Sequence, residues 1–163
     1  MKNTSELKSR YWMIILYPDS CSVNWINILW DLNVKCVVSP LHEYDLRDDG
    51  TFKKPHYHIL IQFNGGRTKS SVYENIITPL KALDRFDKIY DKTSAFEYLI
   101  HKNNPEKYQY SYDKIQFINS HSYDWIEEDY LTILNYIDDN KIKSFVKLNV
   151  NSIEPPTSFK PSI

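Results

Sequence analysis

The sequence has few cysteines and no long apolar run. Its two cysteines, Cys21 and Cys36, fit neither a disulfide framework nor the spacing of metal ligands, so both are expected to be ordinary thiols in a reducing compartment. No apolar stretch approaches the roughly 20 residues that cross a membrane. The apolar run at 11–17, after a polar start, is too short for a signal peptide. We therefore expect a soluble, cytoplasmic protein with no membrane partner.

The chain also lacks a strong excess of charge of either sign. Its net charge of -1 does not by itself indicate a nucleic-acid-binding protein. Residues 1–122 carry 16 Lys and Arg against 14 Asp and Glu, a net of +2, and residues 123–163 carry 4 against 7, a net of -3. Any DNA contact is therefore expected in the first part, above all in the basic stretches around its histidines.

One stretch, residues 53–63 (KKPHYHILIQF), has the alternating pattern of a β-strand. Pro55 stands where it can begin the strand without interrupting a hydrogen-bond ladder. His56 and His58 then project side by side from one face of a sheet. Imidazole is the commonest metal ligand in proteins, so this pair makes half of a metal site. Taken alone, the two histidines fit a solvated sheet face equally well.

The remaining pattern predicts a single α+β domain with an antiparallel sheet flanked by helices. Strands are expected at 10–17, 35–39, 86–90 and 115–118, and helices at 23–32, 71–83 and 93–102. Asn64-Gly65-Gly66 is expected to break the histidine strand, and Thr93 or Ser94 to cap the third helix. From residue 123 an acidic amphipathic pattern predicts a helical extension to about 150, followed by a disordered tail at 151–163.

Two further ligand candidates lie in the loop at 40–52, which joins the second strand to the histidine strand. If these two strands pair, His42 and Asp45 approach His56 and His58. Three imidazoles and one carboxylate suit Mn²⁺, Zn²⁺ or Co²⁺, whereas sites built for Mg²⁺ prefer oxygen. An ion with an open coordination position can bind a phosphate oxygen as a Lewis acid.

A nucleophile candidate lies on the predicted third helix. Tyr98 shares a helical face with His101 and Lys102, and a phenol beside a polarised phosphodiester can attack phosphorus. Lys102 is one turn on and can stabilise charge at the phosphate. With 13 tyrosines in the chain, however, any single one is more often an ordinary core or surface residue. His101 alone fits a cation at a helix C-terminus.

Together, three motifs resemble a known family. The loop SPLHEYDLRDDG, the strand KPHYHILIQF and the segment AFEYLIHKNNPEKYQYS, in this order, are similar to motifs of the HUH endonucleases. Within these, residues 10–118 most resemble the plasmid rolling-circle replication initiators that have one catalytic tyrosine. The family's domain is an antiparallel sheet flanked by helices, related to the ferredoxin-like and RNA-recognition (RRM) folds.

The resemblance implies roles for particular residues. His42, Asp45, His56 and His58 match the family's metal ligands, with Mn²⁺ or Mg²⁺ as the expected cofactor, and Tyr98 matches its nucleophile. Such proteins nick single-stranded origin DNA, stay attached to the 5′ phosphate, leave a free 3′ hydroxyl and rejoin strands. The implied partners are single-stranded and double-stranded origin DNA and the host replication machinery in a bacterial cytoplasm.

Other assignments are less specific. His101 and Lys102 are expected to contact phosphate or support the ligands, and the role of His101 stays open. Residues 1–122 are expected to form the nuclease and origin-binding domain, and 123–150 a helical extension that can serve oligomerisation. Basic and aromatic side chains supply the candidate DNA contacts, which are Lys53, Lys54, Arg67, Lys69, Lys107, Tyr108 and Tyr110.

Three alternatives compete with a nicking initiator. A relaxase or single-strand transposase would share its chemistry. A non-catalytic, RRM-like nucleic-acid-binding module would carry the histidines as surface residues and need no metal. A two-histidine phosphodiesterase needs two separate His-x-Ser/Thr motifs, and neither His42-Glu43-Tyr44 nor His56-Tyr57-His58 fits that pattern.

Overall fold

The computed structural model describes residues 6–126 of the chain. These residues contain an antiparallel sheet of five strands in the order β4-β1-β3-β2-β5. The predicted α+β class is confirmed, as is the pairing of the second strand with the histidine strand. The strands are β1 Lys8–Leu16, β2 Lys35–Val38, β3 Tyr57–Thr68, β4 Asp87–Lys88 and β5 Gln116–Ile118.

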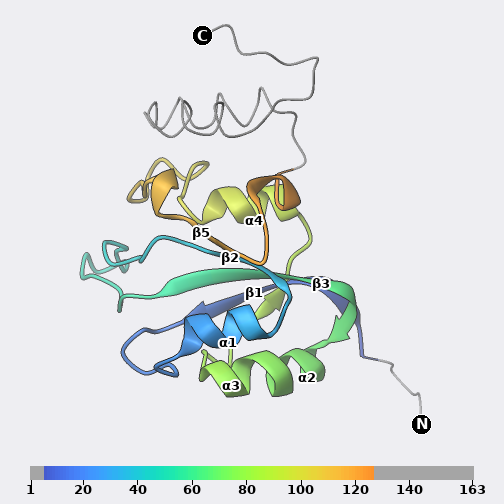
Figure 1. The fold of residues 1–163 in the computed structure, drawn as a ribbon. Coiled ribbons are helices and arrows are strands. Elements are labelled where there is room, and N and C mark those ends of the chain that lie inside the picture. Colours follow the sequence, from blue (N-terminus) through green and yellow to red (C-terminus); the bar gives the residue numbers. More distant parts are fainter. Residues whose placement is uncertain (1–5, 127–163) are drawn as a thin grey trace, which may run out of the picture. The chain divides into compact units, whose positions relative to one another are not determined.

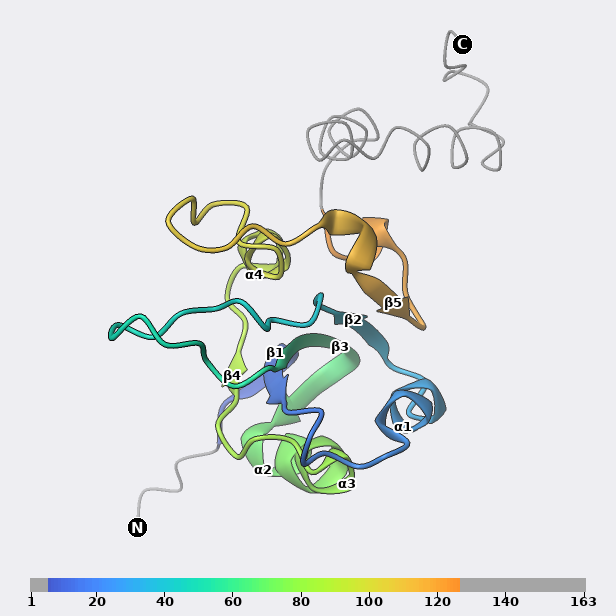
Figure 2. The same ribbon diagram turned by 90° about the vertical axis from the view of Figure 1, so that its left-hand side faces the viewer.

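Helices cover both faces of the sheet. In Figures 1 and 2, α1, α2 and α3 lie on one side of the strands and α4 on the other. Three helical pieces run consecutively between residues 69 and 80, with one π-helical turn, η1, in the middle. None of the helices in residues 6–126 is long and apolar enough to cross a membrane. The helical elements are α1 Trp25–Asp31, α2 Lys69–Val72, η1 Tyr73–Ile77, α3 Thr78–Leu80, α4 Lys92–Tyr98 and the 3₁₀ turns η2 Tyr112–Lys114 and η3 Ser122–Asp124.

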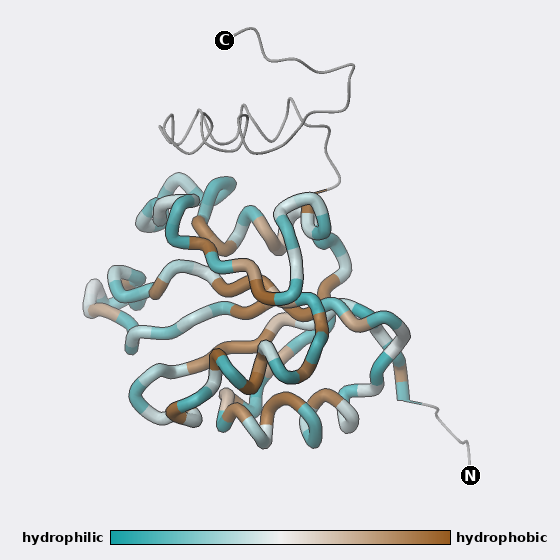
Figure 3. The backbone as a smooth tube through the Cα atoms, in the orientation of Figure 1, coloured by the Kyte–Doolittle hydropathy of each residue, from teal (hydrophilic) through white to brown (hydrophobic). Residues whose placement is uncertain are grey.

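Strand β3 is buried on both of its faces between His58 and Ile61. Ile59 and Ile61 belong to the core that β1 and β3 share with α1, α2 and α3. His58 and Leu60, on the other face, are also buried. The hydropathy colouring in Figure 3 shows apolar residues concentrated along the central strands. The histidine face is therefore an interior surface, and burying imidazoles there requires partners for their nitrogen atoms.

The predicted break at Asn64-Gly65-Gly66 is wrong, because β3 continues to Thr68. Its end pairs with the start of β1, with Lys8 opposite Thr68 and a bulge between Ser9 and Tyr11. A Cβ at Gly66 would lie 3.1 Å from Lys8 Cβ. The glycine thus allows the two strands to approach closely where the sequence pattern suggested a turn.

The ends of two helices also differ from the expectation. Asp91 caps α4, since its carboxylate accepts bonds from the Ser94 amide at 3.2 Å and the Ser94 hydroxyl at 2.8 Å. Thr93 and Ser94 lie inside the first turn, so neither is the cap. Helix α4 ends at Tyr98, and His101 follows it in the left-handed region with φ of 60°. The second predicted helix ends at Leu80, where Lys81 takes a left-handed conformation.

Residues 122–126 pack onto the sheet domain. The sequence predicts a helix from residue 123, but Ser122–Asp124 form a 3₁₀ turn. Trp125 is fully buried, and Asp124 pairs with Lys35 of β2 at 2.6 Å. The predicted helices and tail beyond residue 126 lie outside the described residues.

The burial of β3 predicts a large cost for truncating its apolar side chains. Ile61→Ala should lower the free energy of unfolding by about 2–5 kcal/mol, because it removes a fully buried side chain and leaves a cavity. Val23→Ala, at an exposed position, should change it by less than about 0.5 kcal/mol. Urea unfolding followed by tryptophan fluorescence measures both. Equal effects of the two substitutions would contradict the assignment of the core.

Candidate active site

Backbone pairing brings the loop after β2 against the histidine strand. His42 and His56 form a bridge in which His42 N donates to His56 O at 2.9 Å and His56 N donates to His42 O at 3.3 Å. Between this bridge and the β2–β3 ladder, Ser39 binds the backbone of His58 through both its amide and its hydroxyl. As a result the His42 ring lies 5.4 Å from the ring of His56 and 4.8 Å from that of His58.

The carboxylate of Asp45 lies at the centre of the cluster. Its Oδ2 is 3.2 Å from Nδ1 of His42 and 3.7 Å from Nε2 of His56. Its Oδ1 accepts a hydrogen bond of 2.6 Å from the hydroxyl of Tyr110. The Tyr110 ring stacks on His42 with centroids 4.2 Å apart, and its hydroxyl also accepts from the Tyr44 amide. Asp45 is thus fixed from both sides.

Three imidazoles have one nitrogen hydrogen-bonded to a backbone carbonyl. Nε2 of His42 donates to Leu99 O at 2.8 Å, Nδ1 of His56 to Lys54 O at 2.8 Å, and Nδ1 of His101 to Tyr108 O at 2.9 Å. A carbonyl only accepts, so each of these nitrogens carries the proton. In neutral His56 the lone pair is then on Nε2, the nitrogen that faces Asp45. Such outer hydrogen bonds orient histidines as metal ligands.

The donor set fits a divalent ion. Ligand atoms of His42, His56 and His58 lie within 4.8 Å of one another, and so do those of His42, Asp45 and His101. Nδ1 of His58 and Nε2 of His101 are buried without a hydrogen-bond partner. A buried imidazole nitrogen in that state is open to an ion. His101, left open on sequence grounds, is therefore part of the same cluster.

Burial favours the neutral forms of His56, His58 and His101. It lowers the pKa of His58 well below its usual range, and the neighbouring His42 and His56 lower it further. Burial also lowers the pKa of His56 and His101, although their bonds to carbonyls act in the opposite direction. For Asp45, burial raises the pKa, but hydrogen bonds from His42 and Tyr110 outweigh it and hold the pKa well below its usual range. His56, His58 and His101 are thus neutral nitrogen donors beside the ionised carboxylate of Asp45, a combination that can bind a cation.

Tyr98 lies at the edge of this cluster. Its half-buried ring is 5.4 Å from the ring of His58 and 5.2 Å from that of His101. Its hydroxyl accepts a hydrogen bond of 3.2 Å from the ammonium group of Lys107. Lys102, expected near the phosphate, lies 3.9 Å from Glu97 instead, because the chain leaves the helix after Tyr98. Lys107 is therefore the cation beside the phenol.

A cationic cavity of about 460 Å³ opens onto the histidine face and Tyr98. Lys53 and Lys54, predicted as DNA contacts, line it together with Arg47 and Arg85. Arg85 was not expected there, because no motif marks it. A backbone contact places Arg85 at the cavity, because Leu83 N donates to Ile15 O at 2.9 Å and holds the segment before β4 against the end of β1.

The remaining predicted DNA contacts do not line this cavity. Arg67 lies near the far end of β3, Lys69 begins α2, and Lys107 and Tyr108 belong to the loop after α4. Tyr110 is 6% exposed and its hydroxyl is bonded to Asp45, so the structure gives it a role inside the cluster, and its contact with DNA stays a prediction. The sequence offers only its place in the segment KYQYSY, and that pattern does not show which of the tyrosines is buried.

Comparison with known proteins identifies the family. Residues 4–124 match the family model described as plasmid replication protein, origin binding domain. The chain therefore belongs to the family of plasmid replication proteins with an origin-binding domain.

Three relatives agree with this assignment. The chain is 39% identical over 103 residues to replication protein RepB of Lactiplantibacillus plantarum, which covers 63% of this chain and 45% of the relative. It is 32% identical over 111 residues to a replication protein of Staphylococcus aureus, covering 67% and 54%. It is 32% identical over 125 residues to replication protein RepB of Streptococcus agalactiae, covering 72% and 60%. The chain thus spans about half the length of the curated relatives it matches.

The buried histidines predict that acid destabilises the metal-free protein. In the unfolded chain His58 has an ordinary pKa near 6.5, whereas in the fold burial holds the pKa well below that value. As the pH falls below about 6.5, only the unfolded state takes up the proton, so the free energy of unfolding decreases. Each unit of pKa difference corresponds to about 1.4 kcal/mol. Urea unfolding in EDTA, from about pH 7.5 to about pH 5, measures this decrease.

Two substitutions provide controls. His58→Gln should reduce the slope of unfolding free energy against pH. Ser20→Ala changes an exposed residue that does not titrate and lies outside the cluster, and it should leave the slope as in the wild type. An unchanged slope in His58→Gln would contradict the assignment of a buried, neutral His58.

Proposed function

We propose that this chain carries the nicking centre of a plasmid rolling-circle replication initiator, with Tyr98 as the nucleophile. The observation that supports it most strongly is the shared cavity of Tyr98, His56 and His58, lined by Arg47, Lys53, Lys54 and Arg85. A phosphodiester in this cavity would meet a phenol, metal-ligating imidazoles and cations together. Because the chain belongs to a family with an origin-binding domain, the proposed substrate is DNA.

The proposed metal ligands are His42, Asp45, His56 and His58. When bound there, Mn²⁺ or Mg²⁺ would act as a Lewis acid on a phosphate oxygen. Three nitrogen donors favour Mn²⁺ over Mg²⁺. His101 holds its ring by the bond to Tyr108 O and directs Nε2 into the same cluster, where it is suited to support the ligands or to contact the phosphate. Leu99 O and Lys54 O keep the lone pairs of His42 and His56 on the ligand side.

The reaction follows from the position of Tyr98. The phenol oxygen forms a bond to phosphorus, the bond from phosphorus to the 3′ oxygen breaks, the phenol loses a proton and the leaving oxygen gains one. The products are a 5′-phosphotyrosine and a free 3′ hydroxyl, and attack by a 3′ hydroxyl in reverse rejoins the strand. Lys107, 3.2 Å from the phenol oxygen, stabilises the negative charge that oxygen carries when it leaves in the reverse step.

The proposed substrate is a single-stranded segment of a plasmid origin, which the same domain first recognises as duplex. A single strand is needed because the scissile phosphate must reach the half-buried Tyr98. The host replication machinery would extend the 3′ hydroxyl in the bacterial cytoplasm. The proposal also includes the domain organisation. Residues 1–122 would form the nuclease and origin-binding domain, and residues 123–150 would form a helical extension that can serve oligomerisation.

A covalent adduct gives the direct test. Single-stranded oligonucleotides that tile the protein's own replicon are mixed with the protein in Mn²⁺ or in EDTA and run on a denaturing gel. Wild type should give a slow, metal-dependent band with one tile. Tyr98→Phe should bind that tile with unchanged affinity and give no band, because it lacks the attacking oxygen. Tyr73→Phe, at an exposed tyrosine outside the cavity, should give the wild-type band.

Two outcomes would contradict the proposal. An adduct formed by Tyr98→Phe would move the nucleophile to another residue. DNA binding without an adduct, with any tile and either metal, would favour a non-catalytic binding module.

A further inference from the structure

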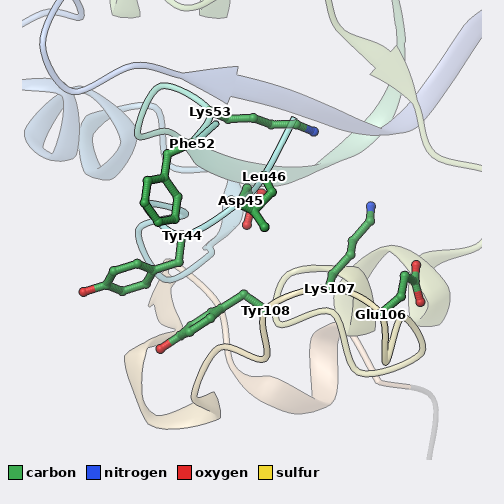
Figure 4. A pocket seen from close by; sticks show the side chains of 8 residues that line it. All are labelled: Tyr44, Asp45, Leu46, Phe52, Lys53, Glu106, Lys107 and Tyr108. Atoms are coloured by element: carbon green, nitrogen blue, oxygen red, sulfur yellow. The ribbon is translucent and has the colours of Figure 1, made fainter. Parts of the chain in front are cut away.

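A second cavity, of about 650 Å³, adjoins the histidine cluster (Figure 4). It lies between the loop that carries Asp45 and the loop after α4, which extend from the same end of the molecule (Figures 1 and 2). Asp45 and Lys53 line this cavity as well as the cationic one, so the two lie next to each other. The lining residues are Tyr44, Asp45, Leu46, Phe52, Lys53, Glu106, Lys107 and Tyr108.

Apolar side chains gather in this cavity without being buried. Tyr44, Phe52 and Tyr108 are 46%, 60% and 50% exposed, and Leu46 is 56% exposed. The ring of Tyr44 lies 4.8 Å from that of Tyr108 and 6.3 Å from that of Phe52. Large apolar groups that share an exposed hollow mark a binding site more often than scattered ones do.

The backbone holds this aromatic group in place. Lys53 N donates to Asp45 O at 2.7 Å and Arg47 N donates to Thr51 O at 2.7 Å, so the loop is a tight hairpin. Gly50 makes its turn with φ of 83°. On the other side, Tyr108 O accepts the bond from His101, which anchors the second loop to the metal cluster. Rings presented by anchored loops lose little entropy when a ligand binds.

Charge and aromatic surface are separated within the cavity. Figure 4 shows the rings of Tyr44, Phe52 and Tyr108 on one side and the ammonium groups of Lys53 and Lys107 extending away from them. Lys107 is also the cation 3.2 Å from the Tyr98 hydroxyl. Of the two carboxylates that line the cavity, that of Asp45 is already bonded to Tyr110, and that of Glu106 lies on the side of the lysines.

We propose that this cavity binds an unpaired nucleobase next to the scissile phosphate, stacked on Tyr108, Tyr44 and Phe52. The base would fill the aromatic side, and its flanking phosphates would lie on Lys53 and Lys107. A paired base in a duplex has both faces covered by its neighbours, so only an unpaired one can present a face to these rings. The inference deepens the proposed nicking function, because it states what holds the substrate strand beside Tyr98.

The occupant follows from the chemistry of the cavity. Aromatic rings bind any base through its π-face, and lysines bind the phosphates between bases. The family's origin-binding role provides the DNA. The contact between Lys107 and Tyr98 fixes the position of the substrate strand along the site, because a phosphate bound to Lys107 is within reach of the proposed nucleophile. In this arrangement one base of the substrate strand stacks on the protein rings and not on its neighbouring bases.

Binding to abasic oligonucleotides tests this inference. The probe is the single-stranded replicon tile that wild type binds most tightly in EDTA, which prevents cleavage. A series of this oligonucleotide carries one abasic site at each position in turn. One position should weaken binding about tenfold or more, the loss expected for one stacked base. Tyr108→Ala should lose a similar factor and should then be insensitive to the abasic site at that position.

Two variants control for effects on folding. Tyr108→Phe keeps the ring and should bind as wild type does. Tyr73→Ala removes a tyrosine that is 43% exposed and outside this cavity, and should also bind as wild type. Equal sensitivity to the abasic site in Tyr108→Ala and wild type would overturn the inference, as would a series in which no position matters.

The nicking proposal and this inference fail separately. If the abasic effect depends on Tyr108 but wild type forms no adduct in Mn²⁺, the base site stands and the nuclease fails. If wild type forms the adduct but Tyr108→Ala binds the tile as tightly as wild type, the nuclease stands and the base site fails.

Discussion

The bond between Asp45 and Tyr110 is the contact on which the rest of the site depends. A carboxylate surrounded by buried imidazoles must be held in one orientation, and the 2.6 Å hydrogen bond from Tyr110, together with His42 on the other side, does this. Tyr110 also stacks on His42, so one tyrosine fixes both the carboxylate and one imidazole. Because Tyr110 belongs to the loop after α4, the same contact joins the segment that carries Tyr98 to the loop that carries Asp45. The proposed ligands and the proposed nucleophile are thereby held in one arrangement.

The fold provides the rest through its backbone. The pairing of β2 with β3 continues past Val38 into the bridge between His42 and His56, so a sheet ladder sets the spacing of the histidines. Carbonyls of Leu99, Lys54 and Tyr108 then determine which nitrogen of the His42, His56 and His101 rings carries a proton. Burying neutral imidazoles costs stability in acid, and a bound cation would offset that cost. A site of this kind couples metal binding to the stability of the domain.

The sequence predicted what depends on pattern and missed what depends on packing. Strand alternation gave the histidine strand, and strand pairing gave the approach of His42 and Asp45, because both follow from local periodicity. Gly65 and Gly66 look like a turn in sequence, and only the position of Lys8 shows that Gly66 allows close strand pairing. The roles of Tyr110, Lys107 and Arg85 depend on where their segments end in space. The sequence also could not show that Tyr110 is buried while Tyr108, two residues earlier, is exposed.

The central claim is that His42, Asp45, His56 and His58 bind one ion beside Tyr98. Anomalous diffraction from crystals grown with Mn²⁺ tests it most directly. The account predicts a single strong anomalous peak within coordination distance of Nδ1 of His42, the Asp45 carboxylate, Nε2 of His56 and a ring nitrogen of His58. A peak elsewhere in the molecule, or no peak at a Mn²⁺ concentration that supports adduct formation, would contradict it.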